Sequence, residues 1–222
     1  MRKLTLMTAV GLLVLVLGTS LVFGEGVYQA KKAATPVVID GVLTEWEGIP
    51  ALELTLEDGG KATFKCQWDS NFLYVAVVVE DKVQYNPYTG SNIWQGDNLQ
   101  LALDGRNNKS MSYDADDYEY GWALTDSGLE AWAWQVATGV TFKADLMSFI
   151  VVPCTEDNPV TIYEIAIPKE LIQPAKLEAG YQMGFNWLVN DNDGAGRAYV
   201  EWTLGVGNQK NPSYFDTLLL VN

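Results

Sequence analysis

The stretch Ile93-Trp94-Gln95-Gly96-Asp97-Asn98-Leu99-Gln100-Leu101-Ala102-Leu103-Asp104 decides the fold class, because its second half alternates strictly. Leu99, Leu101 and Leu103 share one parity, so in a strand of period two they point to the same face. Asn98 and Gln100 have the opposite parity. The stretch therefore predicts a strand with one face in a hydrophobic core and the other face toward solvent.

Trp94 has the parity of Asn98 and Gln100, so an indole and two amides stand together if the chain stays extended through Gly96. An aromatic ring that stacks on the apolar face of a sugar, beside amides that bind its hydroxyl groups, is the chemistry of sugar recognition. A tryptophan that closes the edge of a core fits the same pattern. On this basis Trp94, Asn98 and Gln100 are candidate carbohydrate-binding residues.

Strand-like segments recur along the rest of the chain with short turn signals between them, and helical periodicity of any length is missing. Further strands are predicted at residues 62–68, 72–79, 118–124, 130–136, 146–152, 160–167, 183–190 and 214–221, with a short strand before Asp40-Gly41 and a short helix at 168–172. The aromatic residues of the 118–136 hairpin all have even parity, which predicts one strongly aromatic face: Tyr118, Tyr120, Trp122, Trp132 and Trp134. The pattern predicts an all-β fold, an antiparallel β-sandwich with at most one or two short helices, and a closed barrel fits it as well.

The first 24 residues have the features of a secretory signal. Arg2 and Lys3 form a basic start, and residues 6–23 are almost wholly apolar. An uncleaved membrane anchor is the alternative, since the apolar run is near the lower limit for crossing a bilayer. We therefore expect a secreted, periplasmic or cell-surface protein whose residues 25–222 form a single domain.

Charge and composition exclude several classes of function. A net charge of −14 repels phosphate backbones and anionic lipids, so neither nucleic acid nor a membrane surface is an expected partner. The chain has no histidine, which excludes Ser-His-Asp and Cys-His catalysis and imidazole metal sites. Cys66 and Cys154 either pair in an oxidising compartment or remain two buried thiols.

Five short motifs, in this order, resemble those of the family 9 carbohydrate-binding modules, a β-sandwich family related to the DOMON-like sandwiches. They are Val38-Ile39-Asp40-Gly41 with Glu45-Trp46, Gln67-Trp68-Asp69 with Leu73-Tyr74-Val75, residues 94–104, Tyr163-Glu164-Ile165-Ala166-Ile167-Pro168, and Gly184-Phe185-Asn186-Trp187-Leu188-Val189-Asn190-Asp191. The resemblance implies an exported, non-catalytic module that binds polysaccharide or oligosaccharide, with structural calcium and with secreted glycoside hydrolases as possible associates.

The resemblance also implies a binding clamp of two tryptophans with an acid, an arginine and a glutamine. The first tryptophan corresponds to Trp94 and the acid to Gln100, whereas the arginine falls at Gly121 and the glutamine at Leu188. The second tryptophan aligns with about Gln209. Trp122, Trp202 and Tyr214 are the candidates for an aromatic residue that replaces this second tryptophan. The full set of candidate sugar-binding residues is Trp94, Asn98, Gln100, Trp122 and Gln209.

Calcium ligands are expected among the acidic turns, where hard oxygen donors are dense. The segment from Asn190 to Gly194 is rich in oxygen donors, and the candidate metal ligands are Asp97, Asp191 and Asp193. This segment is not an EF-hand, because Val189 falls at the first ligand position. Solvated turn residues are the alternative interpretation.

Two other classes of function stay open. Glycoside hydrolysis needs only two carboxyl groups at a suitable separation, and the chain has 28 acidic residues, although no pair stands out by context. A structural or protein-interaction sandwich of the cell surface, without sugar binding, is favoured by the missing clamp residues.

Overall fold

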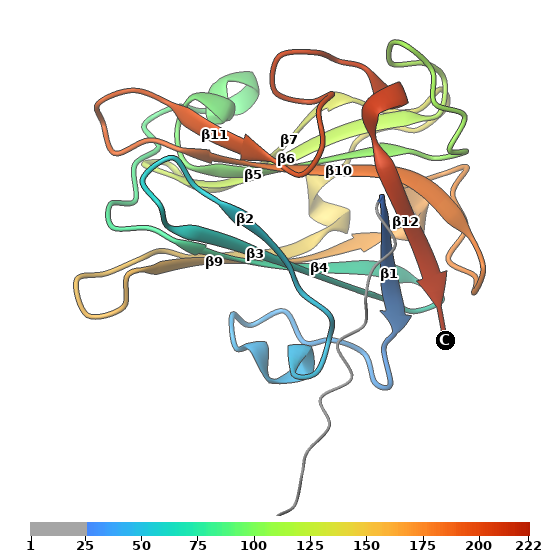
Figure 1. The fold of residues 1–222 in the computed structure, drawn as a ribbon, viewed down its shortest axis with the longest axis horizontal. Helices are drawn as coiled ribbons and strands as arrows, with labels where there is room; N and C mark the ends of the chain where they lie inside the picture. The colour runs from blue at the N-terminus through green and yellow to red at the C-terminus, as the bar shows by residue number, and fades with distance from the viewer. Residues whose placement is uncertain (1–25) are drawn as a thin grey trace, which may run out of the picture.

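The computed structural model describes residues 26–222, so the predicted signal at 1–24 lies outside the described residues and stays a prediction. One continuous sheet of twelve strands folds over into two layers (Figure 1). The strands are β1 (Val27–Lys32), β2 (Leu52–Thr55), β3 (Lys61–Trp68), β4 (Phe72–Glu80), β5 (Asn98–Asp104), β6 (Asp117–Thr125), β7 (Gly128–Gln135), β8 (Ser148–Val152), β9 (Val160–Pro168), β10 (Gln182–Asp191), β11 (Ala198–Glu201) and β12 (Asp216–Val221). The predicted all-β sandwich is confirmed.

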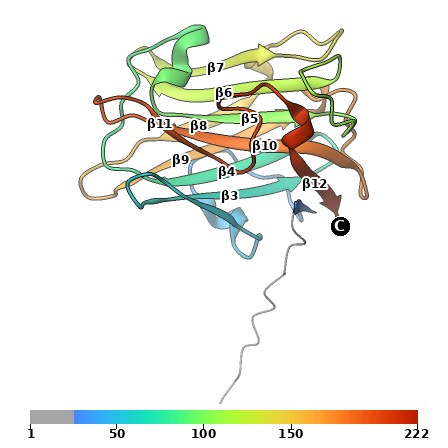
Figure 2. The same cartoon turned by 45° about the horizontal axis from the view of Figure 1, so that its top comes forward.

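The strand order is β7-β6-β5-β10-β12-β1-β3-β4-β9-β8, with β11 beside β10 and β2 beside β3. One layer holds β5, β6, β7, β10 and β11, and the other holds β3, β4 and β9, as the turned view in Figure 2 also shows. All pairings are antiparallel except those of β1, which runs parallel to both β12 and β3. The strands β1, β2 and β11 were not predicted.

Helical structure within residues 26–222 is limited to short 3-10 turns. They are η1 (Leu43–Trp46), η2 (Gly90–Gln95), η3 (Ala144–Leu146), η4 (Lys169–Leu171) and η5 (Pro212–Tyr214). The short helix predicted at 168–172 corresponds to η4, with Pro168 at its N-cap. No helix among these residues is both long enough and apolar enough to cross a membrane.

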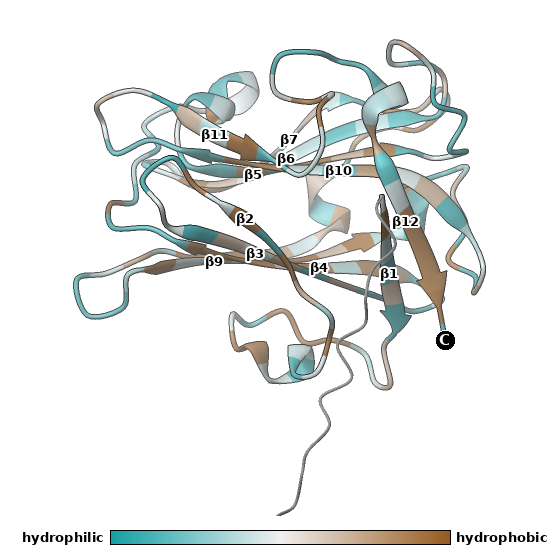
Figure 3. Ribbon diagram, viewed as in Figure 1, coloured by the Kyte–Doolittle hydropathy of each residue, from teal (hydrophilic) through white to brown (hydrophobic). Residues whose placement is uncertain are grey.

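The main core lies between the two layers, where hydrophobic segments of the strands gather (Figure 3). Leu99, Leu101 and Leu103 all belong to it, as predicted. The expectation that the other face of β5 meets solvent was wrong, because every residue of β5 is buried. On that outer face Ala102 packs in a second apolar cluster with Leu188, Val206 and Phe215, and the loop after β11 therefore covers part of the sheet.

The prediction of one aromatic face on the 118–136 hairpin was also wrong. Trp122 lies opposite Ala131, whereas Trp132 lies opposite Gly121, and a bulge interrupts the register between Glu119 and Tyr120. Trp122 therefore faces the core, and Trp132 faces the outside together with the Gly121 backbone. The odd or even numbering of residues in one strand does not predict which face the residues of the neighbouring strand occupy, because the turn and the bulge set the register between the two strands.

The short strand predicted before Asp40-Gly41 is absent, and this segment is a loop held by a buried carboxylate. Glu164 Oε2 accepts hydrogen bonds from the backbone N–H groups of Asp40 (2.9 Å) and Gly41 (2.8 Å). Its Oε1 accepts one from the indole nitrogen of Trp46 at 2.8 Å. Two motifs that are far apart in the sequence, the Asp40-Gly41 and Trp46 motif and the Glu164 motif, thus meet at one side chain of β9.

The two cysteines are free thiols. Cys66 is buried and Cys154 is partly exposed. The sequence left open a disulfide or two buried thiols. In the structure the two cysteines are unpaired, and only Cys66 is fully buried.

Candidate functional site

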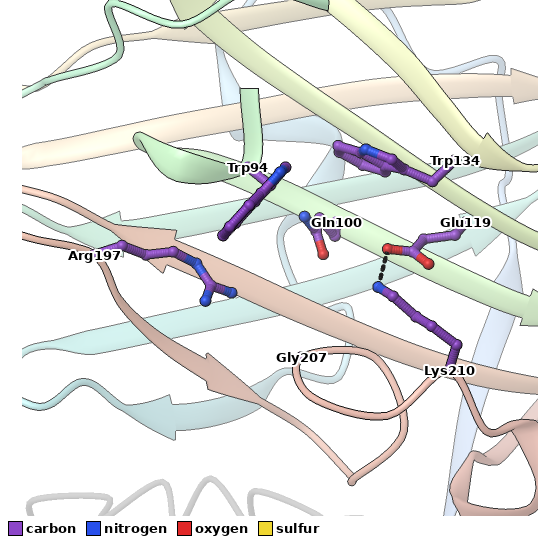
Figure 4. Close-up of a pocket in the computed structure, with 7 residues that line it drawn as sticks. All are labelled: Trp94, Gln100, Glu119, Trp134, Arg197, Gly207 and Lys210. Carbon is purple, nitrogen blue, oxygen red and sulfur yellow. Dashed lines mark hydrogen bonds and ion pairs between the residues drawn. The ribbon is translucent and has the colours of Figure 1, made fainter. Parts of the chain in front are cut away.

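A pocket of about 220 Å³ opens on the outer face of the layer that contains β5, β6 and β7. Its lining comes from five separate parts of the chain (Figure 4): Trp94, Gln100, Glu119, Trp134, Arg197, Gly207 and Lys210. Pockets for drug-sized ligands are typically about 300–1,000 Å³, so this one has the size for a small unit such as a single sugar ring.

Trp94 reaches the pocket from η2 rather than from an extended strand, which corrects the assumption made from its parity. Ile93 beside it is fully buried and anchors the turn, and its carbonyl oxygen accepts a hydrogen bond from Asn86 Nδ2 at 2.9 Å. Gly96 follows so closely that a Cβ there would lie 2.5 Å from Asn86 Cγ. The Trp94 side chain is therefore held on a rigid turn while 38% of the residue remains exposed.

Trp134 supplies a second indole from the edge strand β7, at the bulge opposite β6. Its ring lies directly over Gly121, where a Cβ would be only 2.5 Å from Trp134 Cζ3. Its Nε1 donates a hydrogen bond to the carbonyl oxygen of Ser91 in η2, at 3.0 Å. The glycine at 121, which replaces the arginine expected there, thus provides the space that an aromatic platform occupies.

Gln100 and Asn98 lie on the same face of β5, as predicted, but only Gln100 lines the pocket. Asn98 is fully buried, and its Oδ1 accepts a hydrogen bond from Asn190 Nδ2. Asn190 Oδ1 in turn accepts one from Arg197 Nε. Asn98 therefore acts as a support behind the pocket, at the end of a chain of polar contacts that fixes Arg197.

Arg197 precedes β11 and lies between two aromatic rings. Its guanidinium carbon is 5.0 Å from the centre of the Trp94 ring and 4.4 Å from that of Tyr199, both within the range of cation–π attraction. Burial lowers the pKa of the guanidinium. Gly207 permits this stack, because a Cβ there would lie 2.2 Å from Tyr199 Cε2.

Glu119 and Lys210 form an ion pair on the opposite side of the pocket, with Lys210 Nζ 2.6 Å from Glu119 Oε1. The other carboxylate oxygen of Glu119 accepts a hydrogen bond from the Tyr113 hydroxyl at 2.8 Å. Glu119 is almost wholly buried, whereas half of the Lys210 side chain is exposed. The pair offers both acceptors and donors to a polar ligand.

The remaining predicted platform residues lie elsewhere. Trp122 is fully buried in the main core and cannot stack on a ligand. Trp202 packs on that core beside Phe185, and Tyr214 is exposed in η5 outside the pocket lining. Gln209 is exposed next to Lys210 but is not one of the lining residues.

The predicted metal ligands separate into two groups. Asp97 is a brace, because its Oδ1 accepts from the N–H of Asn192 (2.7 Å) and its Oδ2 from the N–H of Tyr85. Asp191 and Asp193 instead meet Asp81, with ligand atoms of all three within 4.8 Å of one another. Burial and the nearby carboxylates raise the pKa of Asp191 to about 6. Asp97 lies outside this group of ligand atoms, so its role as a metal ligand stays a prediction.

A second acidic cluster of the same dimensions includes Asp116 and Asp117, which the sequence offers as further oxygen donors suited to calcium but not as a ligand set. It joins Asp104, Asp116 and Asp117, all buried. Asp117 Oδ1 is buried without a hydrogen-bond partner among residues 26–222. Burial raises the pKa of Asp117 to about 7. An orphaned oxygen among crowded carboxylates fits the oxygen ligands that Ca²⁺ prefers.

Sequence reasoning missed most of the residues that line the pocket: Glu119, Trp134, Arg197, Gly207 and Lys210. The sequence pattern places Trp134 only in the predicted aromatic face of the 118–136 hairpin. The one available signal was the alignment of the second clamp tryptophan with Gln209, which points to the loop that carries Gly207 and Lys210.

Residues 39–222 match the family described as carbohydrate family 9 binding domain-like. The endo-1,4-beta-xylanase A of Thermoanaerobacterium saccharolyticum is 27% identical over 201 residues, which are 86% of this chain and 15% of that protein. The exoglucanase XynX of Acetivibrio thermocellus is 29% identical over 208 residues, which cover 84% of this chain and 16% of that protein. The chain thus spans about a sixth of the length of these relatives.

Solved structures show the same fold. A family 9 carbohydrate-binding module from Caldicellulosiruptor kristjanssonii in complex with cellotriose has a TM-score of 0.68 at 23% identity, covering 88% of this chain and 94% of that one. A putative carbohydrate-binding protein from Bacteroides uniformis has a TM-score of 0.58 at 13% identity, and the match covers 87% of this chain and 98% of that one.

Proposed function

The chain belongs to the carbohydrate family 9 binding domain-like family, and from this premise we propose that its pocket between Trp94 and Trp134 binds a sugar ring of a polysaccharide or oligosaccharide. The observation that carries the proposal is the pair of indoles that flank Gln100 in one pocket (Figure 4). The indoles supply apolar platforms, and Gln100, Glu119 and Lys210 supply donors and acceptors for hydroxyl groups.

The proposed activity is binding without catalysis. The matched family is one of binding domains, and the xylanases are matched over only about a sixth of their length. Among residues 26–222 Glu119 is the only carboxylate that lines the pocket, whereas glycoside hydrolysis needs a pair. Carbohydrate-degrading enzymes are proposed as partners or as neighbouring domains.

The test is sugar binding by calorimetry after a glycan array, on wild type and Trp94→Ala. We expect dissociation constants of about 1 μM to 1 mM for wild type and at least about tenfold weaker binding for Trp94→Ala, because half of the aromatic contact is lost. Trp132→Ala is the matched control, since Trp132 has nearly the same exposure as Trp94 (39% against 38%) but lies outside the pocket lining.

A blank array, or equal losses in the two variants, contradicts the proposal and favours a structural or protein-interaction role. Release of reducing sugar over time contradicts the non-catalytic assignment.

Calcium is proposed as a structural ion held by Asp104, Asp116 and Asp117, and by Asp81, Asp191 and Asp193. A cation bound only by the folded state would offset the repulsion within each group. With affinities of about 0.1–1 mM, as in other extracellular modules, about 10 mM Ca²⁺ stabilises each site by about 1.4–2.7 kcal/mol. With both sites filled the total is about 2.8–5.4 kcal/mol, and we expect the melting temperature to rise by about 6–20 °C over that in chelator.

The Asp117→Asn variant should lose part of this rise, whereas Asp145→Asn, at an exposed position outside both clusters, should keep it. Identical melting curves in chelator and in calcium contradict the proposal.

Export is a further proposal, supported by the basic and apolar start of the sequence. A mature protein whose mass corresponds to residues 25–222 is the expected result, and retention of Met1 on the secreted product contradicts it.

A further inference from the structure

The pocket has a charge opposite to that of the rest of the molecule. Its lining contains two cations, Arg197 and Lys210, and one carboxylate, Glu119. The whole chain has a net charge of −14. A pocket with one excess positive charge in so acidic a protein attracts anions locally while the surface around it repels them.

Each oxygen of the carboxylate already has one partner within the protein. Glu119 accepts from Lys210 Nζ at 2.6 Å and from the Tyr113 hydroxyl at 2.8 Å, and it is almost wholly buried. Lys210 also donates to the carbonyl oxygen of Val206. The positive charge of Lys210 is therefore largely balanced inside the pocket wall.

Arg197 has no such balance. Residues 26–222 contain four ion pairs, and none of them includes Arg197. The charge of Glu201 acts on Arg197, but Glu201 forms no ion pair with it, and its Oε2 accepts hydrogen bonds from the backbone N–H groups of Val206 and Gly207. Of the Arg197 nitrogens, Nε donates to Asn190, and the terminal nitrogens make no hydrogen bond to residues 26–222.

The guanidinium is also held in place. Trp94 and Tyr199 contact it, Asn190 binds its Nε, and in Figure 4 it points toward Gln100 across the pocket. A partly desolvated charge without a direct ion-pair partner is costly, and a preorganised guanidinium fork matches a planar carboxylate with two parallel hydrogen bonds.

We propose that the pocket selects a sugar that carries a carboxylate, a uronic acid, with the carboxylate on Arg197 and the ring between Trp94 and Trp134. This inference rests on the proposed sugar-binding function of the same pocket. One excess positive charge suits one negative charge. A phosphorylated sugar carries about −1.5 to −2 at pH 7 and would bring a second charge toward Glu119, so we expect the pocket to disfavour it.

The test compares glucuronate, its uncharged methyl ester, glucose and glucose 6-phosphate by calorimetry at low salt. We expect glucuronate to bind at least about tenfold more tightly than the ester, because a charge-assisted pair replaces a neutral contact. The ratio of the two affinities should shrink as salt is raised, since Trp94 and Lys210 in the lining are partly exposed and salt screens charges there.

Variants assign the preference to the arginine. Arg197→Gln should bring the ratio of glucuronate to ester affinity close to one, and Arg197→Lys should keep part of it, because a point charge replaces the fork. Lys176→Gln removes one positive charge at an exposed position outside the pocket and should leave the ratio unchanged.

Equal affinity for acid and ester, an unchanged ratio in Arg197→Gln, or tighter binding of glucose 6-phosphate overturns the inference while neutral sugar binding still stands. Absence of binding by all four sugars overturns it together with the proposed function.

Discussion

Replacing Glu164 by alanine is expected to destabilise the fold by about 4 kcal/mol or more, because three donors then lose a charged acceptor inside the protein. The N–H groups of Asp40 and Gly41 and the indole of Trp46 all donate to this fully buried carboxylate. Hydrogen bonds to a charged group contribute about 1.5–3 kcal/mol each, and a small domain has only about 5–15 kcal/mol in total. The loop from 34 to 46 should detach first.

Urea unfolding with linear extrapolation measures this change. Glu164→Gln should be nearly as harmful, because the amide nitrogen that replaces one oxygen cannot accept a hydrogen bond. Glu156→Ala is the control, since it removes the same charge from an exposed loop. A free energy of unfolding within about 1 kcal/mol of wild type for Glu164→Ala contradicts the proposed role of the carboxylate.

Asp97→Ala is expected to lower the free energy of unfolding by about 2–4 kcal/mol, whether calcium is present or not. Each carboxylate oxygen accepts one backbone N–H, from Asn192 and from Tyr85, in a nearly buried position. Removing the acceptor leaves both donors unpaired, at about 1–3 kcal/mol for each. Because this brace ties the two ends of the segment that carries η2, at Tyr85 and Asp97, to the residue after β10, sugar binding through Trp94 should weaken as well.

Unfolding curves in chelator and in calcium distinguish a brace from a metal ligand. A brace gives the same loss in both media, whereas a ligand gives a loss that disappears in chelator. Asp145→Ala, at an exposed position, serves as the control for a lost negative charge. A loss seen only in calcium contradicts the assignment of Asp97 as a brace.

The clamp expected from the resemblance and the pocket in the structure share their chemistry but only part of their residues. Trp94 and Gln100 occupy the pocket, as expected. The second aromatic ring comes from Trp134 instead of the neighbourhood of Gln209, and the guanidinium comes from Arg197 instead of position 121. A glycine at 121 makes the exchange possible, because it leaves room for the Trp134 ring.

The sequence by itself determined the all-β class, most of the strands and the core face of β5, since alternation over a single strand records burial at each residue. It could not show that Trp122 faces the core while Trp134 faces the pocket, because a bulge between β6 and β7 sets that relation. The same holds for Glu119, Arg197 and Lys210, which lie far apart in the chain. Only the packing of β6 against the loops around β11 decides that their charges line one pocket, because that contact depends on tertiary structure and leaves no local periodic signal.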